Sequence, residues 1–495
     1  MNVQHSETKK VDAKGDKLRF AIIGAGMSGI LTAIKLQEKG INNFTIYEKT
    51  DKLGGTWREN TYPGLSCDVP SHLYRYAFEP NPNWSHMFSP GQEIWEYFNG
   101  VADKYDVKRF IKYSTEVTKT EYDNGKWTLE MADGSRDTVD FVIAATGILH
   151  HLVYPDIKGL DSFAGPCFHS AKWDHSASLN GKRVGIIGTG STAMQIVPAI
   201  VDQVDKVSLF QRTAQWVLPL PNPAFSDDEL KAFRDSPELV EEAYNEALQF
   251  FASTFSEAVI GNETQKADVS ARCQANLDTV KDPELKAKLT PNYQAMCKRL
   301  VMSDDFYPAI QKPNADLVTA GIERIEPNGV RTSDGVLHEL DVLVIATGFD
   351  GHAFTGPLNV VGQNGVTLEE AWADAKEAYH SVAVPGFPNF FMLVGPNSPI
   401  GNFSVILISE AQIGYILQLV ELARDGECRA IAAKKDATDQ FNADIKEAMK
   451  DTIWVSGCSS WYIDKNGNPA MWPWSFQKFC DDMEKPNLED FELIA

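Results

Sequence analysis

The sequence has no excess of positive charge and few cysteines. Its 495 residues carry 46 Lys and Arg against 68 Asp and Glu, which gives a formal net charge of −22. That balance argues against nucleic-acid binding, because such binding needs a basic face. The seven cysteines are scattered, odd in number and form no CxxC pair. We therefore expect buried or free thiols in a reducing compartment, and no metal site.

The chain also lacks the apolar segments of targeted or membrane-bound proteins. Residues 1–17 are polar, have no apolar signal-peptide core and are expected to be disordered. No apolar run reaches the length of a membrane span, and the acidic C-terminus offers no anchor. These features predict a cytoplasmic protein without a membrane partner.

A phosphate-binding turn is present near the start of the chain. Residues 18–49 read as an apolar strand, a glycine turn, a helix and a second strand, and the turn holds Gly24, Gly26 and Gly29 in GxGxxG spacing. These glycines permit the turn, let a pyrophosphate approach the backbone and let helix and strand pack closely. Glu48 ends the second strand, where a carboxylate can hold ribose hydroxyls.

The segment that follows, GGTWRENTYPGLSCD, favours FAD over NAD at this first turn. Gly54 and Gly55 suit a backbone that lies against a ligand. On residue type alone, Trp57 and Tyr62 are interpreted as core aromatics. Asp68 can cap a following helix, a role that is compatible with a functional one.

A second turn repeats the pattern with Gly188, Gly190 and Ala193, and alanine is an accepted variant at the third place. The strand after it ends without an acidic residue, and Arg212 stands there instead. An arginine at this point suits a 2′-phosphate, so the sequence favours NADPH over NADH.

Two aliphatic strands end in the same tripeptide, Ala-Thr-Gly, at 145–147 and 346–348, which suggests a duplicated architecture. We predict an α/β fold with two Rossmann-like dinucleotide-binding domains. The expected parts are a tail at 1–17, an FAD-binding domain at 18–150, an NADPH-binding domain at 151–345 with a helical insertion at about 220–300, and a second part of the FAD-binding domain at 346–495 with a C-terminal mobile loop.

Three motifs make the sequence similar to the type I Baeyer–Villiger monooxygenases, a family of class B flavoprotein monooxygenases. The paired turns are shared with other flavin enzymes, whereas the run from Gly54-Gly55-x-Trp57 to Asp68 is more specific. The stretch FAGPCFHSAKWD matches the family fingerprint FxGxxxHxxxW[P/D] at Phe163, Gly165, His169, Trp173 and Asp174. The resemblance covers about residues 18–480.

The resemblance implies a reaction and its catalytic residues. NADPH would reduce FAD, O₂ would add at the flavin C4a position, and the resulting peroxyflavin would convert a small apolar ketone into an ester or lactone. Arg299 would lie beside C4a as the fixed cation for the oxyanion, and Asp68 would position it. Spacing alone would make Arg299 a surface ion-pair partner of Asp304 or Asp305.

The resemblance also implies cofactor-binding residues. Besides the glycines of the first turn and Glu48, those on the FAD side are Gly55, Thr56, Trp57, Asp68 and the flavin-side aromatic Tyr74. On the NADPH side, Ser191, Thr192 and Gln195 would line the pyrophosphate after Gly188 and Gly190, while Arg212, Thr213 and Lys298 would contact the 2′-phosphate, and Trp461 would close over the nicotinamide. The stretch after Trp461 resembles the subgroup that acts on acyclic or aryl ketones.

We interpret the fingerprint stretch as the joint between the two domains, with His169 holding the linker and Trp173 packed as an anchor. Two alternative functions are an N- or S-oxygenating flavin monooxygenase, which usually carries Tyr or Phe in place of Trp173, and a cofactor-free scaffold of the same fold. A disulfide reductase would need a redox cysteine pair beside the flavin, which we expect to be absent. A monomer or weak homo-oligomer is expected.

Overall fold

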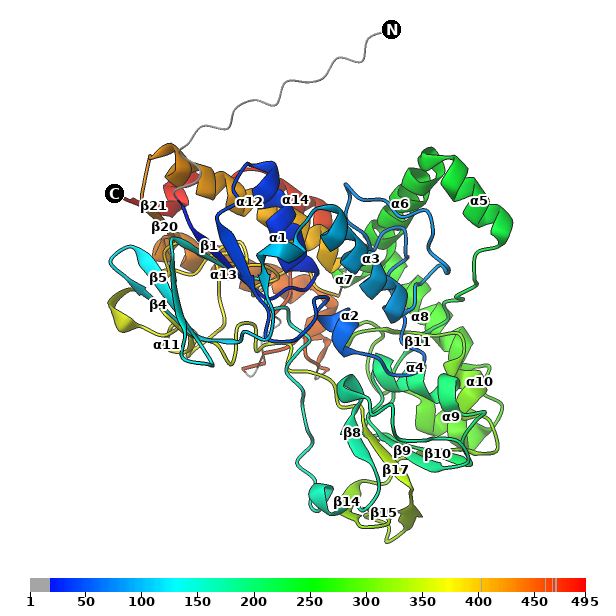
Figure 1. Ribbon diagram of the computed structural model, residues 1–495. Helices are drawn as coiled ribbons and strands as arrows, with labels where there is room; N and C mark the ends of the chain where they lie inside the picture. The colour runs from blue at the N-terminus through cyan, green and yellow to red at the C-terminus, as the bar shows by residue number, and fades with distance from the viewer. Residues whose placement is uncertain (1–17, 402, 459, 465, 468–469) are drawn as a thin grey trace.

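The computed structural model describes residues 18–401, 403–458, 460–464, 466–467 and 470–495 (Figure 1). The tail at 1–17, predicted to be disordered, lies outside these residues. Two parallel five-stranded sheets form the centres of two bodies, one in the upper left of Figure 1 and one below it. The site is built where the two bodies meet.

The first sheet has the strand order β19-β7-β1-β2-β3. Its strands pair in parallel, and four of them are buried along their whole length, as expected for a sheet with both faces covered. Strand β19 comes from the last quarter of the chain and pairs with β7. The strands are β1 (Phe20–Ile23), β2 (Phe44–Tyr47), β3 (Ile111–Lys112), β7 (Phe141–Ala144) and β19 (Phe390–Met392).

The second sheet has the order β13-β10-β9-β17-β8 and is also parallel. Its edge strand β8 lies inside the fingerprint stretch, for which no strand was predicted and which was interpreted as the joint between the two domains. Three residues are too few to show an alternating pattern, so this strand escaped prediction. The strands are β8 (Cys167–His169), β9 (Arg183–Ile187), β10 (Lys206–Phe210), β13 (Ala315–Val318) and β17 (Val342–Ile345).

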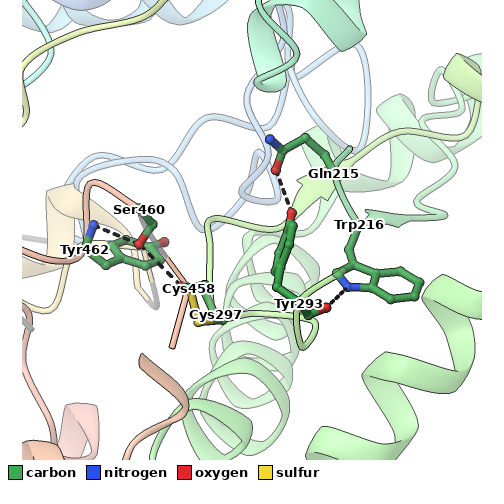
Figure 2. The surroundings of a disulfide bond; sticks show 7 residues. All are labelled: Gln215, Trp216, Tyr293, Cys297, Cys458, Ser460 and Tyr462. Carbon is green, nitrogen blue, oxygen red and sulfur yellow. Dashed lines mark hydrogen bonds between the residues drawn. A yellow bond between two sulfur atoms is a disulfide. The ribbon is translucent and has the colours of Figure 1, made fainter. Parts of the chain in front are cut away.

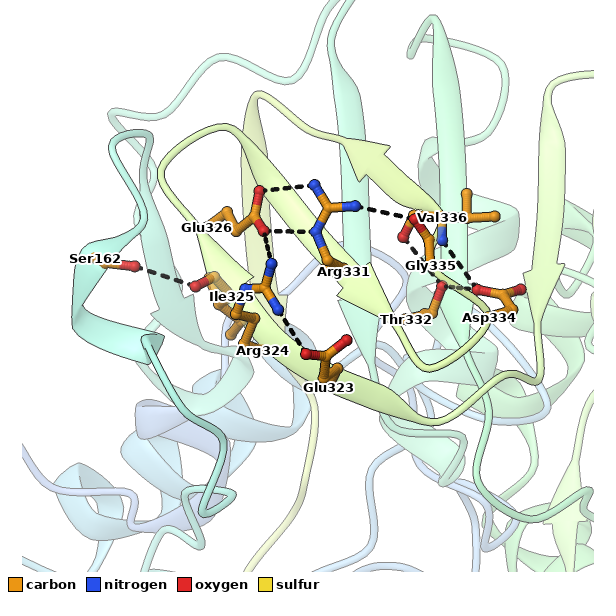
Figure 3. A network of polar contacts seen from close by, with 10 residues as sticks. All are labelled: Ser162, Glu323, Arg324, Ile325, Glu326, Arg331, Thr332, Asp334, Gly335 and Val336. Atoms are coloured by element: carbon orange, nitrogen blue, oxygen red, sulfur yellow. Dashed lines mark hydrogen bonds and ion pairs between the residues drawn. The ribbon is translucent and has the colours of Figure 1, made fainter.

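Smaller sheets extend both bodies. The first body carries β4 (Val117–Asp123), β5 (Lys126–Met131), β6 (Arg136–Val139) and β18 (Asn359–Val361), together with the pair β20 (Ala430–Ala433) and β21 (Phe491–Ile494). The second carries β14 (Ile322–Glu326), β15 (Gly329–Thr332) and β16 (Leu337–Glu339). Figure 3 shows that Glu326 accepts from both Arg324 (2.7 Å) and Arg331 (2.6 Å) on the surface of this small sheet. The short strands β11 (Val217–Leu218) and β12 (Val301–Met302) pair with each other.

The helices between β11 and β12 form the arm at the right of Figure 1, with α5 and α6 projecting furthest. They are α5 (Asp227–Asp235), α6 (Pro237–Phe251), α7 (Glu257–Val259), α8 (Glu263–Leu277) and α9 (Pro283–Leu289), and a π-helical turn (Ala252–Ser256) joins α6 to α7. The other helices are α1 (Met27–Glu38), α2 (Thr56–Glu59), α3 (Gly91–Lys104), α4 (Ser191–Ile200), α10 (Phe306–Ile310), α11 (Leu368–Ala371), α12 (Val405–Asp425), α13 (Lys435–Ala448) and α14 (Phe476–Glu484).

Helix α12 corrects one expectation from the sequence. It has 21 residues and a mean hydropathy of 1.5 over its most apolar window, so by length and composition it is long and apolar enough to cross a membrane. More than half of that window is buried inside the protein, where α12 packs against α1 and α14. Core helices of soluble proteins pass the same test, so α12 carries no argument for a membrane span.

Candidate active site

One cavity of about 1480 Å³ is lined by both glycine turns and by residues from both bodies, including the C-terminal part of the chain. Ligand pockets for a single drug-sized molecule have volumes of about 300–1,000 Å³. This cavity is larger, and its two glycine turns give it two phosphate-binding ends. Its volume and its two phosphate-binding ends therefore suit two ligands bound at the same time.

The two turns are built in the same way. Gly24 and Gly188 have φ values of +103° and +117°, a conformation that side chains rarely adopt. A Cβ on Gly24 would lie 2.6 Å from the carbonyl oxygen of Ala145, and one on Gly188 would lie 2.3 Å from that of Ala346. Both alanines begin the Ala-Thr-Gly tripeptides, so each tripeptide crosses directly behind one glycine turn.

The helix that follows each turn begins without a side-chain cap. Gly26 precedes α1 and Gly190 precedes α4, neither first turn contains an acidic residue, and both glycines line the cavity. Uncapped N–H groups with the positive end of the helix dipole attract a pyrophosphate. A Cβ on Gly190 would meet nothing within 4 Å, so space next to this backbone is open. The two cradles fit two dinucleotides.

At the first glycine turn, Glu48 is buried and lines the cavity. Its Oε2 accepts from the backbone N–H of Ala25 (2.9 Å), and its Oε1 accepts from the N–H and hydroxyl of Thr50 (2.9 and 2.7 Å). These three bonds fix the carboxylate, while its other lone pairs can serve ribose hydroxyls.

Gly55, Thr56, Trp57 and Tyr74 also line the cavity on this side. The indole N–H of Trp57 donates to the hydroxyl of Tyr74 (3.0 Å), and the two rings meet edge to face. Burial raises the pKa of Tyr74, so its hydroxyl stays protonated. The pair forms a fixed aromatic corner of the cavity wall.

Near the second glycine turn, Arg212 and Lys298 line the cavity and lie close enough to affect one another. Burial, and then the charge of Arg212, lowers the pKa of Lys298. Lys298 lies over the ring of Tyr293, with its Nζ 4.7 Å from the centroid. Within the part of the chain that the structure describes, no carboxylate forms an ion pair with either cation. Two adjacent unpaired cations on an acidic protein suit a phosphate.

Gln195 lines the cavity, but its amide also joins the two bodies. Its Nε2 donates to the carbonyl of Ser66 (3.0 Å), and its Oε1 accepts from the hydroxyl of Tyr62 (3.0 Å). Gly64 packs so closely on α4 that a Cβ there would lie 2.4 Å from the carbonyl oxygen of Gln195. Ser191, Thr192 and Thr213 line the cavity nearby. Tyr62, interpreted from its residue type as a core aromatic, thus also bonds across the interface.

Arg299 and Asp68, 231 residues apart in the sequence, form an ion pair in the cavity wall. A second guanidinium nitrogen donates to the carbonyl of Gly401 (2.5 Å). Burial alone would lower the pKa of Arg299, but the negative charge of Asp68 outweighs burial and raises the pKa. The guanidinium therefore stays charged. Gly401 and Tyr462 were not predicted from the sequence, because nothing local connects them with Arg299.

The fingerprint residues lie outside this wall. His169 is buried, its Nδ1 accepts from the N–H of Ala171 (3.1 Å), and its Nε2 lies 3.2 Å from the carbonyl of Gly348. Gly348 ends the second Ala-Thr-Gly tripeptide, where the chain crosses between the bodies. Trp173 packs edge to face on Phe168, and Asp174 accepts from the N–H and hydroxyl of Ser176 (2.9 and 2.6 Å). Phe163 is buried in a small core of the second body, and Gly165 packs on the carbonyl of Asp341.

The structure corrects the expectation that all cysteines are free. Cys297 and Cys458 form a disulfide with Cα atoms 6.1 Å apart, and the other five cysteines are free. Figure 2 shows this bond beside Ser460 and Tyr462. A cysteine pair therefore lies close to Arg299, but neither cysteine lines the cavity, so this pair does not provide the redox group of a disulfide reductase.

Trp461 follows this disulfide and lines the cavity. Its backbone carbonyl lies 2.7 Å from Nε2 of His352, and its ring packs on Gly351. The segment 350–353 thus supports the loop that carries the tryptophan.

The comparisons with known proteins agree with this geometry. A family model described as flavin-binding monooxygenase-like matches residues 17–224. The chain is 38% identical over 493 residues to a Baeyer–Villiger monooxygenase of Streptomyces coelicolor, covering 97% of this chain and 93% of that one. This chain is a member of the Baeyer–Villiger monooxygenase family.

Two further similarities extend over nearly the whole chain. An uncharacterized monooxygenase of Mycobacterium tuberculosis is 47% identical over 473 residues, covering 96% of this chain and 95% of that one. The crystal structure of cyclohexanone monooxygenase from Rhodococcus sp. Phi1 bound to NADP⁺ superimposes with a TM-score of 0.87 at 28% identity, covering 97% of this chain and 99% of that chain. A crystal structure of OTEMO in complex with FAD and NADP also superimposes, with a TM-score of 0.87 at 26% identity. Together with the flavin-binding family model, these structures identify FAD and NADPH as the cofactors of this chain, and the alternative of a cofactor-free scaffold is set aside.

Proposed function

We propose that this enzyme inserts one oxygen atom of O₂ next to the carbonyl group of a small apolar ketone and releases an ester or lactone. The observation that carries the proposal is the Arg299–Asp68 pair in the wall of a cavity that both glycine turns share. A cation at this place can act on groups held by either dinucleotide.

The protein's part in this reaction is binding, placement and charge. Bound FAD supplies the oxygen-activating chemistry and NADPH supplies its electrons. Arg299 supplies a permanent positive charge for the carbonyl oxygen of the ketone, which becomes negative when a nucleophile adds to it. Asp68 and the carbonyl of Gly401 hold the guanidinium from two directions, so its orientation is set before the substrate binds.

The residues next to Arg299 in space support an apolar substrate. Ile400 and Phe403 flank the Gly401 segment whose carbonyl holds Arg299, and both line the cavity, as does Trp461. A ketone with an aliphatic or aromatic body gains from burial against these side chains, while its carbonyl faces the guanidinium.

The test is product analysis with a matched pair of variants. NADPH oxidation is measured with linear, cyclic and aryl ketones and with sulfides, and the products are identified by mass spectrometry. Arg299→Ala should lose about 10²–10³-fold in ester formation, the range for removal of one group that stabilises an oxyanion, while FAD stays bound. Arg136→Ala, on the exposed surface of β6, should behave as the wild type.

Two results would overturn the proposal. Sulfoxides without any ester from the ketone panel would favour the N- or S-oxygenating alternative. Ester formation that persists in Arg299→Ala would remove Arg299 from the catalytic role. The cytoplasmic location and the monomeric or weakly oligomeric state stay predictions, which cell fractionation and light scattering can test.

A further inference from the structure

Arg299 has a third neighbour, Tyr462, to which the proposed mechanism assigns no role. The phenol oxygen of Tyr462 lies close enough to the guanidinium to interact with it, beside the two contacts to Asp68 and Gly401. It also packs directly on Gly401, where a Cβ would lie 2.3 Å from the phenol oxygen. We propose that Tyr462 is a positioning residue, which fixes the orientation of Arg299 and makes it depend on the loop that carries Trp461.

Tyr462 is itself held firmly. Its side chain is buried, and its ring packs against those of Trp454 and Trp461, with centroids 5.6 and 4.4 Å apart. Its backbone N–H donates to the hydroxyl of Ser460 (3.2 Å), and its carbonyl accepts from the N–H of Ala470 (2.8 Å). A side chain fixed at the ring and on both sides of its backbone can transmit its position to a partner.

A phenol suits this role for a chemical reason. The guanidinium only donates hydrogen bonds, so the groups that fix its orientation must be hydrogen-bond acceptors. A second carboxylate beside Asp68 would neutralise the charge that the proposed reaction needs, whereas a hydroxyl accepts a bond and adds no charge. Burial raises the pKa of Tyr462 despite the opposing effect of Arg299, so the phenol stays neutral.

The same loop is tied to the Arg299 segment at further points. Cys458 is bonded to Cys297, and the hydroxyl of Ser460 donates to the carbonyl of Cys297 (3.4 Å). Figure 2 shows these contacts together with Tyr462. Trp461, between Ser460 and Tyr462, lines the cavity. The position of this loop therefore determines both where Trp461 lies in the cavity and how Arg299 is oriented.

The test measures the freedom of Arg299 directly, in the FAD-loaded enzyme. Phenylglyoxal modifies accessible guanidinium groups, and peptide mass spectrometry gives the modification rate of Arg299 alone. Tyr462→Phe keeps the ring and removes the hydroxyl. We expect Arg299 to be modified about fivefold faster, which corresponds to the loss of one net hydrogen bond of about 1 kcal/mol. Ester formed per NADPH consumed should fall by a similar factor.

The matched control is Tyr415→Phe. Tyr415 is also buried, and its hydroxyl has no hydrogen-bond partner among the described residues, so its loss should leave the modification rate of Arg299 unchanged. An equal rate in Tyr462→Phe and the wild type would overturn the inference. So would an equal acceleration in both Tyr→Phe variants, because that would reflect general loosening.

This inference rests on the proposed function, yet the two can fail separately. If no ketone yields an ester but the modification rate still rises in Tyr462→Phe, the positioning holds and the reaction is wrong. If Tyr462→Phe does not fold, Ser460→Ala replaces it, because it removes the hydroxyl that fixes the backbone of Tyr462. That variant must also accelerate modification of Arg299, and an unchanged rate would overturn the inference.

Discussion

The disulfide between Cys297 and Cys458 gives the sharpest prediction about stability. The perturbation is Cys458→Ser, or reduction of the wild type by a phosphine. The bond closes a loop of 161 residues, and in the chain-entropy description a loop of that length stabilises the folded protein by about 5 kcal/mol. Unfolding entropy of about 2.1 cal/mol/K per residue is about 1 kcal/mol/K for this chain. If the chain unfolds in a single transition, its melting temperature should therefore be about 5 °C lower without the bond.

Two assays check this prediction. Thiol titration in denaturant without reductant should find five of the seven cysteines, and full reduction should reveal all seven. Melting followed by flavin fluorescence should show the lower midpoint for Cys458→Ser and for the reduced wild type. Cys167→Ser, which removes an exposed free thiol, is the control and should melt as the wild type.

The outcome that refutes the reasoning is specific. Seven reactive thiols before reduction would show that the bond is not formed in the purified protein, as the sequence analysis expected. Five thiols with the same melting midpoint before and after reduction would show that the bond forms but does not restrict the unfolded chain. The first result would remove the disulfide as a covalent link between the Trp461 loop and the Arg299 segment, and the second would remove only its contribution to stability.

Three further predictions concern single residues. Gly190→Ala should fold normally, because φ at this position is −76° and an added Cβ meets no protein atom. Its KM for NADPH, measured by steady-state kinetics, should rise at least about tenfold, because the methyl group enters the pyrophosphate cradle. Asp68→Asn should retain FAD and lower the ester formed per NADPH about tenfold, because Arg299 loses its charged partner; an unchanged ratio would refute this. Glu410 has a pKa raised by burial from 4.5 to about 7, so its contribution to stability is full below about pH 4.5 and is lost as the pH rises through 7. The melting temperature of Glu410→Gln should therefore fall less steeply between pH 5 and 8 than that of the wild type. The same dependence of melting temperature on pH in both proteins would contradict the assignment.

The sequence predicted what is encoded locally. The glycine turns, Glu48 and Arg212 lie at fixed offsets within single strand–turn–helix units, and such units fold the same way in many proteins. The two Ala-Thr-Gly tripeptides indicated duplication, and the structure places each one behind a glycine turn.

The arrangement around Arg299 could not be predicted in this way. Asp68, Gly401 and Tyr462 come from segments that are far apart in the chain, and only tertiary packing brings them to one guanidinium. Spacing alone would have paired Arg299 with Asp304 or Asp305. The family resemblance supplied Asp68 but not Tyr462. The pairing of Cys297 with Cys458 was missed for the same reason, since scattered cysteines carry no local signal.

The central claim is that oxygen from O₂ enters a ketone at the Arg299 site. Its most direct test is a reaction under ¹⁸O₂ with NADPH and the best ketone of the panel, followed by mass spectrometry of the product. The account predicts an ester or lactone that contains one ¹⁸O atom, formed by the wild type and Arg136→Ala and reduced at least about 10²-fold in FAD-loaded Arg299→Ala. An unlabelled product, or a labelled ester formed equally well by Arg299→Ala, would contradict it.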